Sequence, residues 1–304
     1  MNTIYFDSSV KDDVRLQRIY NGQIFAFSPR PSAIALHQLV CDLLEATFGL
    51  PIPSVIEDGL PVEKFLAAES SLKHQIMNHP QTKELVQSLL QEFECDLSKT
   101  YFDLPQLRIV PARGYLPNNE GMFHDPHRDT WYAAPQCLIN WWIPISEFES
   151  ESALAFHPLY WKQPVNNDSR SFNQEQDYKT NFREAEFPHP EQQIEIEPEI
   201  RIVCPAGGVI LFSGAQMHSA VPNTSGSTRF SLDFRTVHYD DILTNNGAAN
   251  IDSYSTVALL TDFMRGTDLA KFSEDVIASD SKNLLKPTPL QSLSGFKKSE
   301  ISPD

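Results

Sequence analysis

Apolar residues in the first hundred positions recur at the spacing of amphipathic helices. The pattern that begins at Pro31 ends at Gly49. It predicts a helix whose buried stripe is formed by Ile34, Leu39, Val40, Leu43, Leu44 and Phe48. A second helical region starts at Pro61 and is interrupted at Pro80, because proline cannot continue a helix from its interior. Residues 23–28 alternate with a period of two and predict an edge strand.

From Thr100 the pattern changes to short apolar runs separated by proline, glycine and asparagine, which is typical of β-strands. The predicted strands are residues 107–110, 137–145, 153–156, 200–203, 208–212 and 228–238. No helix long enough to cross between parallel strands interrupts this block, so antiparallel pairing is favoured. The predicted fold is mostly β with flanking helices, around a double-stranded β-helix core of the jelly-roll or cupin type.

The chain is predicted to form one domain over residues 1–304. Residues 1–99 are a mainly helical flank and residues 100–240 the core. A polar segment, residues 161–198, interrupts the core and is predicted to be a lid over the pocket, since so long a loop in a compact domain is usually functional. Residues 241–304 are expected to add a short helix at about residues 257–272 and a polar tail.

Composition narrows the classes of function. The chain has 24 Lys and Arg against 40 Asp and Glu, a formal net charge of −16, which argues against nucleic acid as a partner because phosphate binding needs clustered basic residues. It has no secretory leader and no apolar run that could span a bilayer, so we expect a cytoplasmic protein without membrane contact. The scattered cysteines Cys41, Cys95, Cys137 and Cys204 are expected to be free thiols.

Two histidines and two carboxylates are concentrated in the stretch 123–131. His127 and Asp129 are two residues apart, and in an extended strand such residues point to the same face with Cα atoms roughly 6.6 Å apart. Both could then bind one metal ion, and His218 is the best candidate for a second nitrogen ligand. Two histidines and one carboxylate leave open positions on the metal, as expected for non-haem Fe(II) oxygenases.

With these residues in place, the sequence resembles the Fe(II)/2-oxoglutarate-dependent dioxygenases of the phytanoyl-CoA dioxygenase-like branch. The resemblance rests on His127-x-Asp129, the distal His218, and Arg229-x-Ser231 eleven residues later. It implies that the first three residues are catalytic and hold Fe(II), while Arg229 and Ser231 bind the far carboxylate of 2-oxoglutarate. It also implies an enzyme that uses O2 to hydroxylate a small molecule and releases succinate and CO2.

The predicted strand that carries this arginine has two interpretations. Arg229, Ser231, Asp233 and Arg235 share one face, and burying two arginines is costly unless an anion meets them. The other interpretation is a solvent-facing side on which Asp233 pairs with an arginine of the neighbouring strand. Arg229 is preferred over Arg235 for 2-oxoglutarate because of its position after His218, and Arg235 is expected to pair with an acidic neighbour.

Several residues near the motif have less specific signals. His124 is expected to face away from the ligands, and Asp125 is a weak alternative ligand because Pro126 would bend the strand. His157 either lines the pocket or makes an ordinary hydrogen bond. The large aromatic residues are expected to be mostly core, with one or two at the pocket wall; they are Trp131, Tyr132, Trp141 and Trp142.

Two other functions are compatible with the sequence. One is a cupin-type metalloenzyme that needs no cosubstrate, and the other is a jelly-roll binding protein without turnover. Succinate formation that depends on Fe(II) and 2-oxoglutarate separates the first interpretation from these. Hydroxylation is the default outcome, while desaturation, cyclisation and epoxidation use the same ligands and stay open. The acidic net charge favours a small metabolite, such as a biosynthetic intermediate, over a CoA thioester.

Overall fold

The computed structural model describes residues 3–49, 60–112, 115–116, 125–172, 188–255 and 260–283. The strands in these residues are β1 (Ile4–Phe6), β2 (Ile24–Phe27), β3 (Thr100–Phe102), β4 (Gln106–Val110), β5 (Ile139–Pro144), β6 (Leu154–Phe156), β7 (Ile200–Arg201), β8 (Val209–Ser213), β9 (His218–Ala220), β10 (Arg229–His238) and β11 (Met264–Arg265). They form an eight-stranded sheet of order β1-β2-β8-β5-β10-β3-β11, with β4 also on β10, and a three-stranded sheet of order β7-β6-β9. The predicted jelly-roll class, mostly β with flanking helices, is confirmed.

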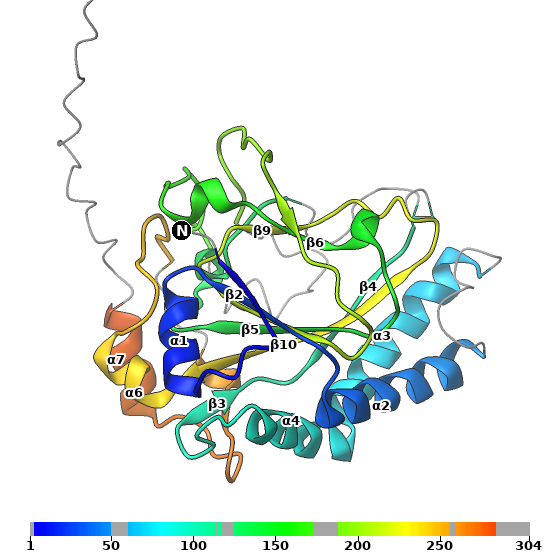
Figure 1. Ribbon diagram of the computed structural model, residues 1–304, viewed down its shortest axis with the longest axis horizontal. Helices are drawn as coiled ribbons and strands as arrows, with labels where there is room; N and C mark the ends of the chain where they lie inside the picture. The colour runs from blue at the N-terminus through cyan, green and yellow to red at the C-terminus, as the bar shows by residue number, and fades with distance from the viewer. Residues whose placement is uncertain are drawn as a thin grey trace, which may run out of the picture.

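Helices cover one side of the larger sheet. The α-helices are α1 (Asp12–Tyr20), α2 (Pro31–Phe48), α3 (Val62–Asn78), α4 (Pro80–Glu92), α6 (Tyr239–Thr244) and α7 (Glu274–Asn283). Short 3-10 helices are η1 (Asp129–Tyr132), η2 (Ser150–Ser152), η3 (Pro158–Trp161) and η4 (Leu260–Asp262). Figure 1 shows α2, α3 and α4 together on one side of the molecule and β6 and β9 on the opposite side. No helix of the described part is long and apolar enough to cross a membrane.

The central strands β5 and β8 of the larger sheet are buried on both faces, and successive side chains of each strand point to opposite sides. Trp141 of β5 and Phe234 of β10 belong to the core that includes the residues of α2, α3 and α4. Trp142 of β5 and Phe212 of β8 belong instead to a second core with Phe156 of β6, between the two sheets. We call the face that meets the smaller sheet the inner face. Two buried faces explain why β5 reads as a continuous apolar run.

Helix boundaries follow local signals closely. The α2 helix ends at Gly49, which adopts a left-handed φ of 73° and donates its amide to the carbonyl oxygen of Glu45 at 2.8 Å, as glycine does most easily. The break between α3 and α4 falls at His79, whose extended backbone precedes Pro80 at the first turn of α4. Proline is tolerated there because the first helical amide has no intrahelical partner.

Some predicted elements are wrong in detail. Residues 23–28 do not form an edge strand, because β2 is buried and lies between β1 and β8. The larger sheet therefore begins within residues 1–99, which are not only a helical flank. In α2 the buried stripe is Ala33, Leu36, Val40 and Leu44, while Ile34 is 48% exposed.

The prediction of a short helix at about residues 257–272 is also wrong. Residues 260–272, the described part of the region predicted as a helix, form η4 and β11, and the α-helices of this part are α6 and α7. Residues 284–304 of the predicted tail lie outside the described residues. So do residues 173–187 of the predicted lid, which stays a prediction.

Candidate metal centre and cosubstrate site

The structure brings His127, Asp129 and His218 together although His218 lies far along the chain. One potential ligand atom from each residue lies within 4.8 Å of the other two. The two histidines form an isolated antiparallel bridge: the amide of His127 donates to the carbonyl of His218 at 2.9 Å, and the reverse bond measures 3.0 Å. The two segments that carry these side chains are thus directly joined by backbone.

Both imidazole rings are oriented in the same way. Nδ1 of His127 lies 2.9 Å from the carbonyl oxygen of Asp125, and Nδ1 of His218 lies 2.9 Å from that of Gln216. A carbonyl only accepts hydrogen bonds, so each Nδ1 carries the proton and each Nε2 keeps a lone pair. Such partners orient metal-binding histidines in known metal sites. Both rings are therefore prepared to offer Nε2 to a metal.

The environment keeps His127 neutral. Burial, and to a smaller extent the neighbouring His218, lower the pKa of His127 to about 3, although Asp129 opposes the shift. A histidine must be neutral to bind a metal. At physiological pH no proton has to leave this ring before it can act as a ligand.

Asp129 does not reach the site by the predicted strand geometry. Arg128 is extended, but Asp129 begins η1. This short helix lies against Gly214, where an added β-carbon would come within 2.6 Å of Cδ2 of Leu138 and 3.4 Å of Cβ of Asp129. A side chain at Gly214 would first have to displace the side chain of Leu138, while its distance from Asp129 would be an ordinary contact.

Asn140 is a site residue that the sequence reasoning missed. Its side-chain amide donates a hydrogen bond to Oδ2 of Asp129, and the residue is only 6% exposed. Asn140 is the polar position within the buried strand Ile139–Pro144. A polar residue in a fully buried run needs a partner, and that signal could have identified it.

Arg229 and Ser231 lie on the inner face of β10, which is also the face of Asn140, because the antiparallel register places Arg235 opposite Asn140. Both are buried, at 3% and 0% exposure. Nη1 of Arg229 donates to the carbonyl of Ser152 at 2.7 Å. Within the described residues, Nε of Arg229 and Oγ of Ser231 have no hydrogen-bond partner. Two unpaired buried polar groups are costly, and one carboxylate could pair with both.

The charge of Arg229 persists in this setting. Burial lowers the pKa of Arg229 to about 10, an effect that Asp233 opposes and Arg108 reinforces. The guanidinium therefore remains protonated at neutral pH. Its central carbon lies 5.7 Å from the centre of the Trp142 ring, which places one aromatic residue of the sequence prediction beside the cationic group.

The other charged residues on this face of β10 each pair with a residue of another segment. Asp233 accepts two hydrogen bonds from Arg108 of β4, at 2.8 and 3.1 Å, so the predicted pairing across the strand holds for this residue. Arg235 contacts Asp103, with Nε 2.5 Å from Oδ2, as expected. Of the two arginines on the face, Arg229 is the one with an unpartnered nitrogen.

The remaining candidates contribute in other ways. The Asp125 side chain is 74% exposed and lies 3.7 Å from Nδ1 of His189, so only its carbonyl takes part in the site. His157 is buried and has Nε2 2.9 Å from Oγ of Ser219, which is the hydrogen-bonding role. His124 lies outside the described residues. The Tyr132 ring lies 5.3 Å from the His127 ring.

The phytanoyl-CoA dioxygenase (PhyH) family model matches residues 57–231. That range is more than half of the chain and includes His127, Asp129, His218, Arg229 and Ser231. The chain belongs to the phytanoyl-CoA dioxygenase family. It is accordingly an Fe(II)- and 2-oxoglutarate-dependent oxygenase that uses O2.

Solved structures also resemble the chain. EvdO2 from Micromonospora carbonacea var. aurantiaca shares 12% identity at a TM-score of 0.45, covering 77% of this chain and 94% of EvdO2. The epimerase SnoN, in complex with Fe3+, alpha ketoglutarate and nogalamycin RO, shares 14% identity at a TM-score of 0.41, covering 86% and 94%. AviO1 from Streptomyces viridochromogenes Tue57 shares 13% at 0.39, covering 76% and 96%. Identities this low say nothing about a common substrate. No curated protein sequence matches the chain.

The residues present fit the cofactors of the family. Two imidazoles and one carboxylate form a donor set suited to Fe(II) with open positions. The unpartnered Nε of Arg229 and Oγ of Ser231 suit a carboxylate, which accepts hydrogen bonds only. Both halves of the fit rest on buried or half-buried residues of this chain.

Proposed function

We propose that this protein hydroxylates a small metabolite or natural-product intermediate at an iron held by His127, Asp129 and His218, with release of succinate and CO2. The observation that carries the proposal is the pair of unpartnered buried atoms on β10, Nε of Arg229 and Oγ of Ser231. They lie on the same face of the sheet as Asn140, which contacts Asp129. A carboxylate bound there would lie on the same face of the sheet as the group that orients Asp129.

Each residue has a distinct part in this proposal. Nε2 of both histidines and one carboxylate oxygen of Asp129 hold the metal, while Asn140 keeps the other oxygen of Asp129 engaged. Arg229 and Ser231 hold the far carboxylate of 2-oxoglutarate, for which the planar guanidinium is well shaped. When bound, iron with 2-oxoglutarate and O2 supplies an oxidant strong enough to remove hydrogen from a C–H bond. The buried surroundings of the site, with Trp142 beside Arg229, limit the access of water.

The substrate class follows from composition and charge. Arg108 and Asp233 neutralise each other on the inner face, and the chain as a whole carries a formal charge of −16. Both features favour a small molecule without several negative charges. The cytoplasmic location stays a prediction, as does hydroxylation over desaturation, cyclisation or epoxidation.

The test is cosubstrate turnover. Purified protein is incubated with Fe(II), 2-oxoglutarate and O2, and succinate is measured with and without each component. We expect slow succinate formation that requires all three and that rises when a true substrate is added, together with a product that has gained one oxygen atom from labelled O2. The absence of anaerobic 2-oxoglutarate binding to the Fe(II)-loaded protein would contradict the proposal and favour a cupin-type or non-catalytic protein.

A further inference from the structure

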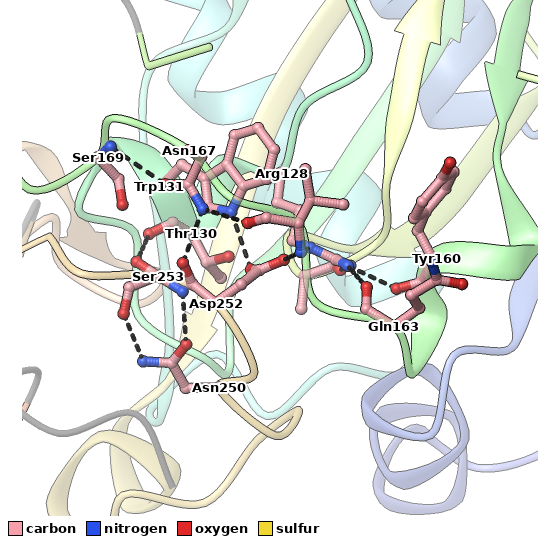
Figure 2. Close-up of polar contacts among 12 residues, drawn as sticks. Arg128, Thr130, Trp131, Tyr160, Gln163, Asn167, Ser169, Asn250, Asp252 and Ser253 are labelled. Carbon is pink, nitrogen blue, oxygen red and sulfur yellow. Dashed lines mark hydrogen bonds and ion pairs between the residues drawn. The ribbon is translucent and has the colours of Figure 1, made fainter. Parts of the chain in front are cut away.

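Arg128, the residue between two of the candidate ligands, donates hydrogen bonds to four acceptors. The residue is 2% exposed. Its Nε donates to Oδ2 of Asp252 at 3.1 Å and its Nη1 to the carbonyl of Ala215 at 2.6 Å. Its Nη2 donates to the carbonyls of Tyr160 and Gln163, at 2.5 and 3.2 Å. Figure 2 shows the guanidinium between Asp252 on one side and Tyr160 and Gln163 on the other.

Asp252 gathers its own set of partners. Its Oδ1 accepts from Nε1 of Trp131 at 2.9 Å, and its Oδ2 accepts from the amide of Val165 at 3.0 Å as well as from Arg128. Its carbonyl accepts from the side chain of Asn167 at 2.8 Å. Figure 2 shows Trp131 and Arg128 meeting at the Asp252 carboxylate. The ion pair is thus satisfied on both sides by groups that are distant in sequence.

The pair joins the two segments that carry the candidate ligands. Arg128 and Trp131 belong to the segment with His127 and Asp129. Ala215 belongs to the turn that leads to His218. The backbone bridge between the two histidines ties these segments at one point, and the bond from Arg128 to Ala215 ties them at a second. A third and longer bond joins the amide of Thr130 to the carbonyl of Gly214 at 3.4 Å. The side chain of Arg128 thus adds a short bond to a contact that backbone atoms make at the histidine bridge and at this longer distance.

Stability alone is a weak reason for a buried ion pair at this position. The side chains of Arg128 and Asp252 are only 2% and 3% exposed. Apolar residues of similar volume at such buried positions often stabilise a fold at least as much as an ion pair does. A guanidinium differs from an apolar group in carrying five N–H donors in one rigid plane. That property lets one side chain hold a carboxylate and three backbone carbonyls in fixed directions.

We propose that the Arg128–Asp252 pair is a positioning device for the iron ligands, which holds the segment of His127 and Asp129 at a fixed distance and angle from the turn before His218. The metal then meets a set of ligands that is already assembled. Arg128 acts through its neighbours and does not touch the metal. The inference rests on the proposed ligand assignment of His127, Asp129 and His218.

The experiment measures metal binding without turnover. Co(II) serves as the probe, and its visible absorption follows both occupancy and ligand geometry during titration of the metal-free protein. The variants are Arg128→Lys, which keeps the charge opposite Asp252 but loses the plane of donors, and the double variant Arg128→Met with Asp252→Asn. Thermal unfolding of each metal-free variant is recorded alongside.

A buried pair elsewhere in the chain provides the matched control. Arg15 and Asp12 of α1 form an ion pair with side chains 5% and 14% exposed, and Arg15 also donates to the carbonyl of Phe93 at 2.7 Å. The control protein carries Arg15→Met with Asp12→Asn. This change removes a similar ion pair and a similar bond to backbone, but it touches none of the candidate ligand segments.

We expect the Kd for Co(II) to rise about 10- to 100-fold in both Arg128 variants, as is usual when a group that orients a metal ligand is lost. The absorption spectrum should change, and the control pair should bind Co(II) as the parent does. An unchanged Kd in Arg128→Lys overturns the proposal. A metal-free Arg128→Lys protein that does not fold also overturns it, because the pair would then serve stability.

His218→Ala in the same titration separates this inference from the assignment of the site. If His218→Ala binds Co(II) as well as the parent, the ligand assignment itself is wrong. If His218→Ala loses binding while Arg128→Lys does not, only the positioning role is wrong.

Discussion

Asn140 donates a side-chain hydrogen bond to Oδ2 of Asp129, from the inner face of β5. This bond engages one carboxylate oxygen of a residue that lies within reach of the two imidazoles. A ligating carboxylate that is held in this way cannot rotate freely, so the metal loses no affinity to an alternative orientation. The relationship makes Asn140 part of the metal site even though its own atoms are not candidate ligands.

Replacing Asn140 with Leu should weaken metal binding about 10- to 100-fold, because the orienting bond is lost while the volume is kept. Asn140→Asp should weaken it further, since a second carboxylate would repel Asp129. Titration with Co(II) measures both effects. Asn223→Leu removes another buried asparagine, one that donates to the carbonyl of Val110, and should leave the Kd unchanged. Equal affinities in Asn140→Leu and the parent would show that Asp129 needs no such partner.

Substituting alanine for His127, Asp129 or His218 should abolish succinate formation, because Fe(II) binds weakly among first-row metals and two ligands cannot retain it. The fold should survive, since the bridge between the histidines is made by backbone atoms. Turnover and thermal unfolding are measured on each variant. His189→Ala, at a half-exposed position, is the histidine control. Full activity in any of the three variants removes that residue from the ligand set.

Arg229→Lys should raise the concentration of 2-oxoglutarate needed for half-saturation, because an ammonium group cannot reproduce the two parallel hydrogen bonds of a guanidinium. Ser231→Ala should act in the same direction with a smaller effect. Anaerobic titration of the Fe(II)-loaded proteins, followed by the metal-to-ligand absorbance band, gives the affinities. Arg235→Lys is the matched control, since Arg235 is paired with Asp103. A larger effect in Arg235→Lys than in Arg229→Lys would reverse the assignment.

The cysteines should react slowly in the native protein. Burial raises the pKa of Cys41 to about 11 and that of Cys204 to about 12, and only the thiolate is nucleophilic. Because pH 8 lies well below both values, almost none of either thiol is ionised. Mass spectrometry after iodoacetamide treatment should find little modification at these two residues, and complete modification in urea. Similar rates in both conditions would contradict the pKa shifts.

The order of motifs along the chain was sufficient to predict the family. Features that depend on neighbouring residues in the sequence were predicted, whereas features that depend on distant residues were not. A short sequence pattern identified each candidate residue of the site: the H-x-D of His127 and Asp129, the strand before His218, and the R-x-S that begins at Arg229. The path of Asp129 could not be predicted, because η1 contacts residues distant in sequence, as in the bond from the amide of Thr130 to the carbonyl of Gly214. The strand β9 was missed because its three residues are defined by pairing with β6, which no local pattern reveals.

The ion pair of Arg128 and Asp252 could not be predicted for the same reason. Nothing near Asp252 in the sequence indicates a partner far upstream in the chain, and both residues look like ordinary surface charges. The C-terminal error has a similar origin: Met264 and Arg265 form a strand through their pairing with β3. Pairing across long sequence separations overrides local propensity at such positions.

The backbone bridge between His127 and His218 has a consequence for how such an enzyme can diversify. His127 and His218 begin and end a long stretch of chain whose two ends are held together by the bridge. The entropic cost of closing a loop rises only slowly with its length. Insertions or deletions in the connections between the core strands of this stretch can therefore alter what surrounds the substrate without separating the two histidines. Selection can then act on substrate preference separately from the oxidative chemistry, and a protein engineer could vary the same connections while keeping strands β5, β6, β7 and β8.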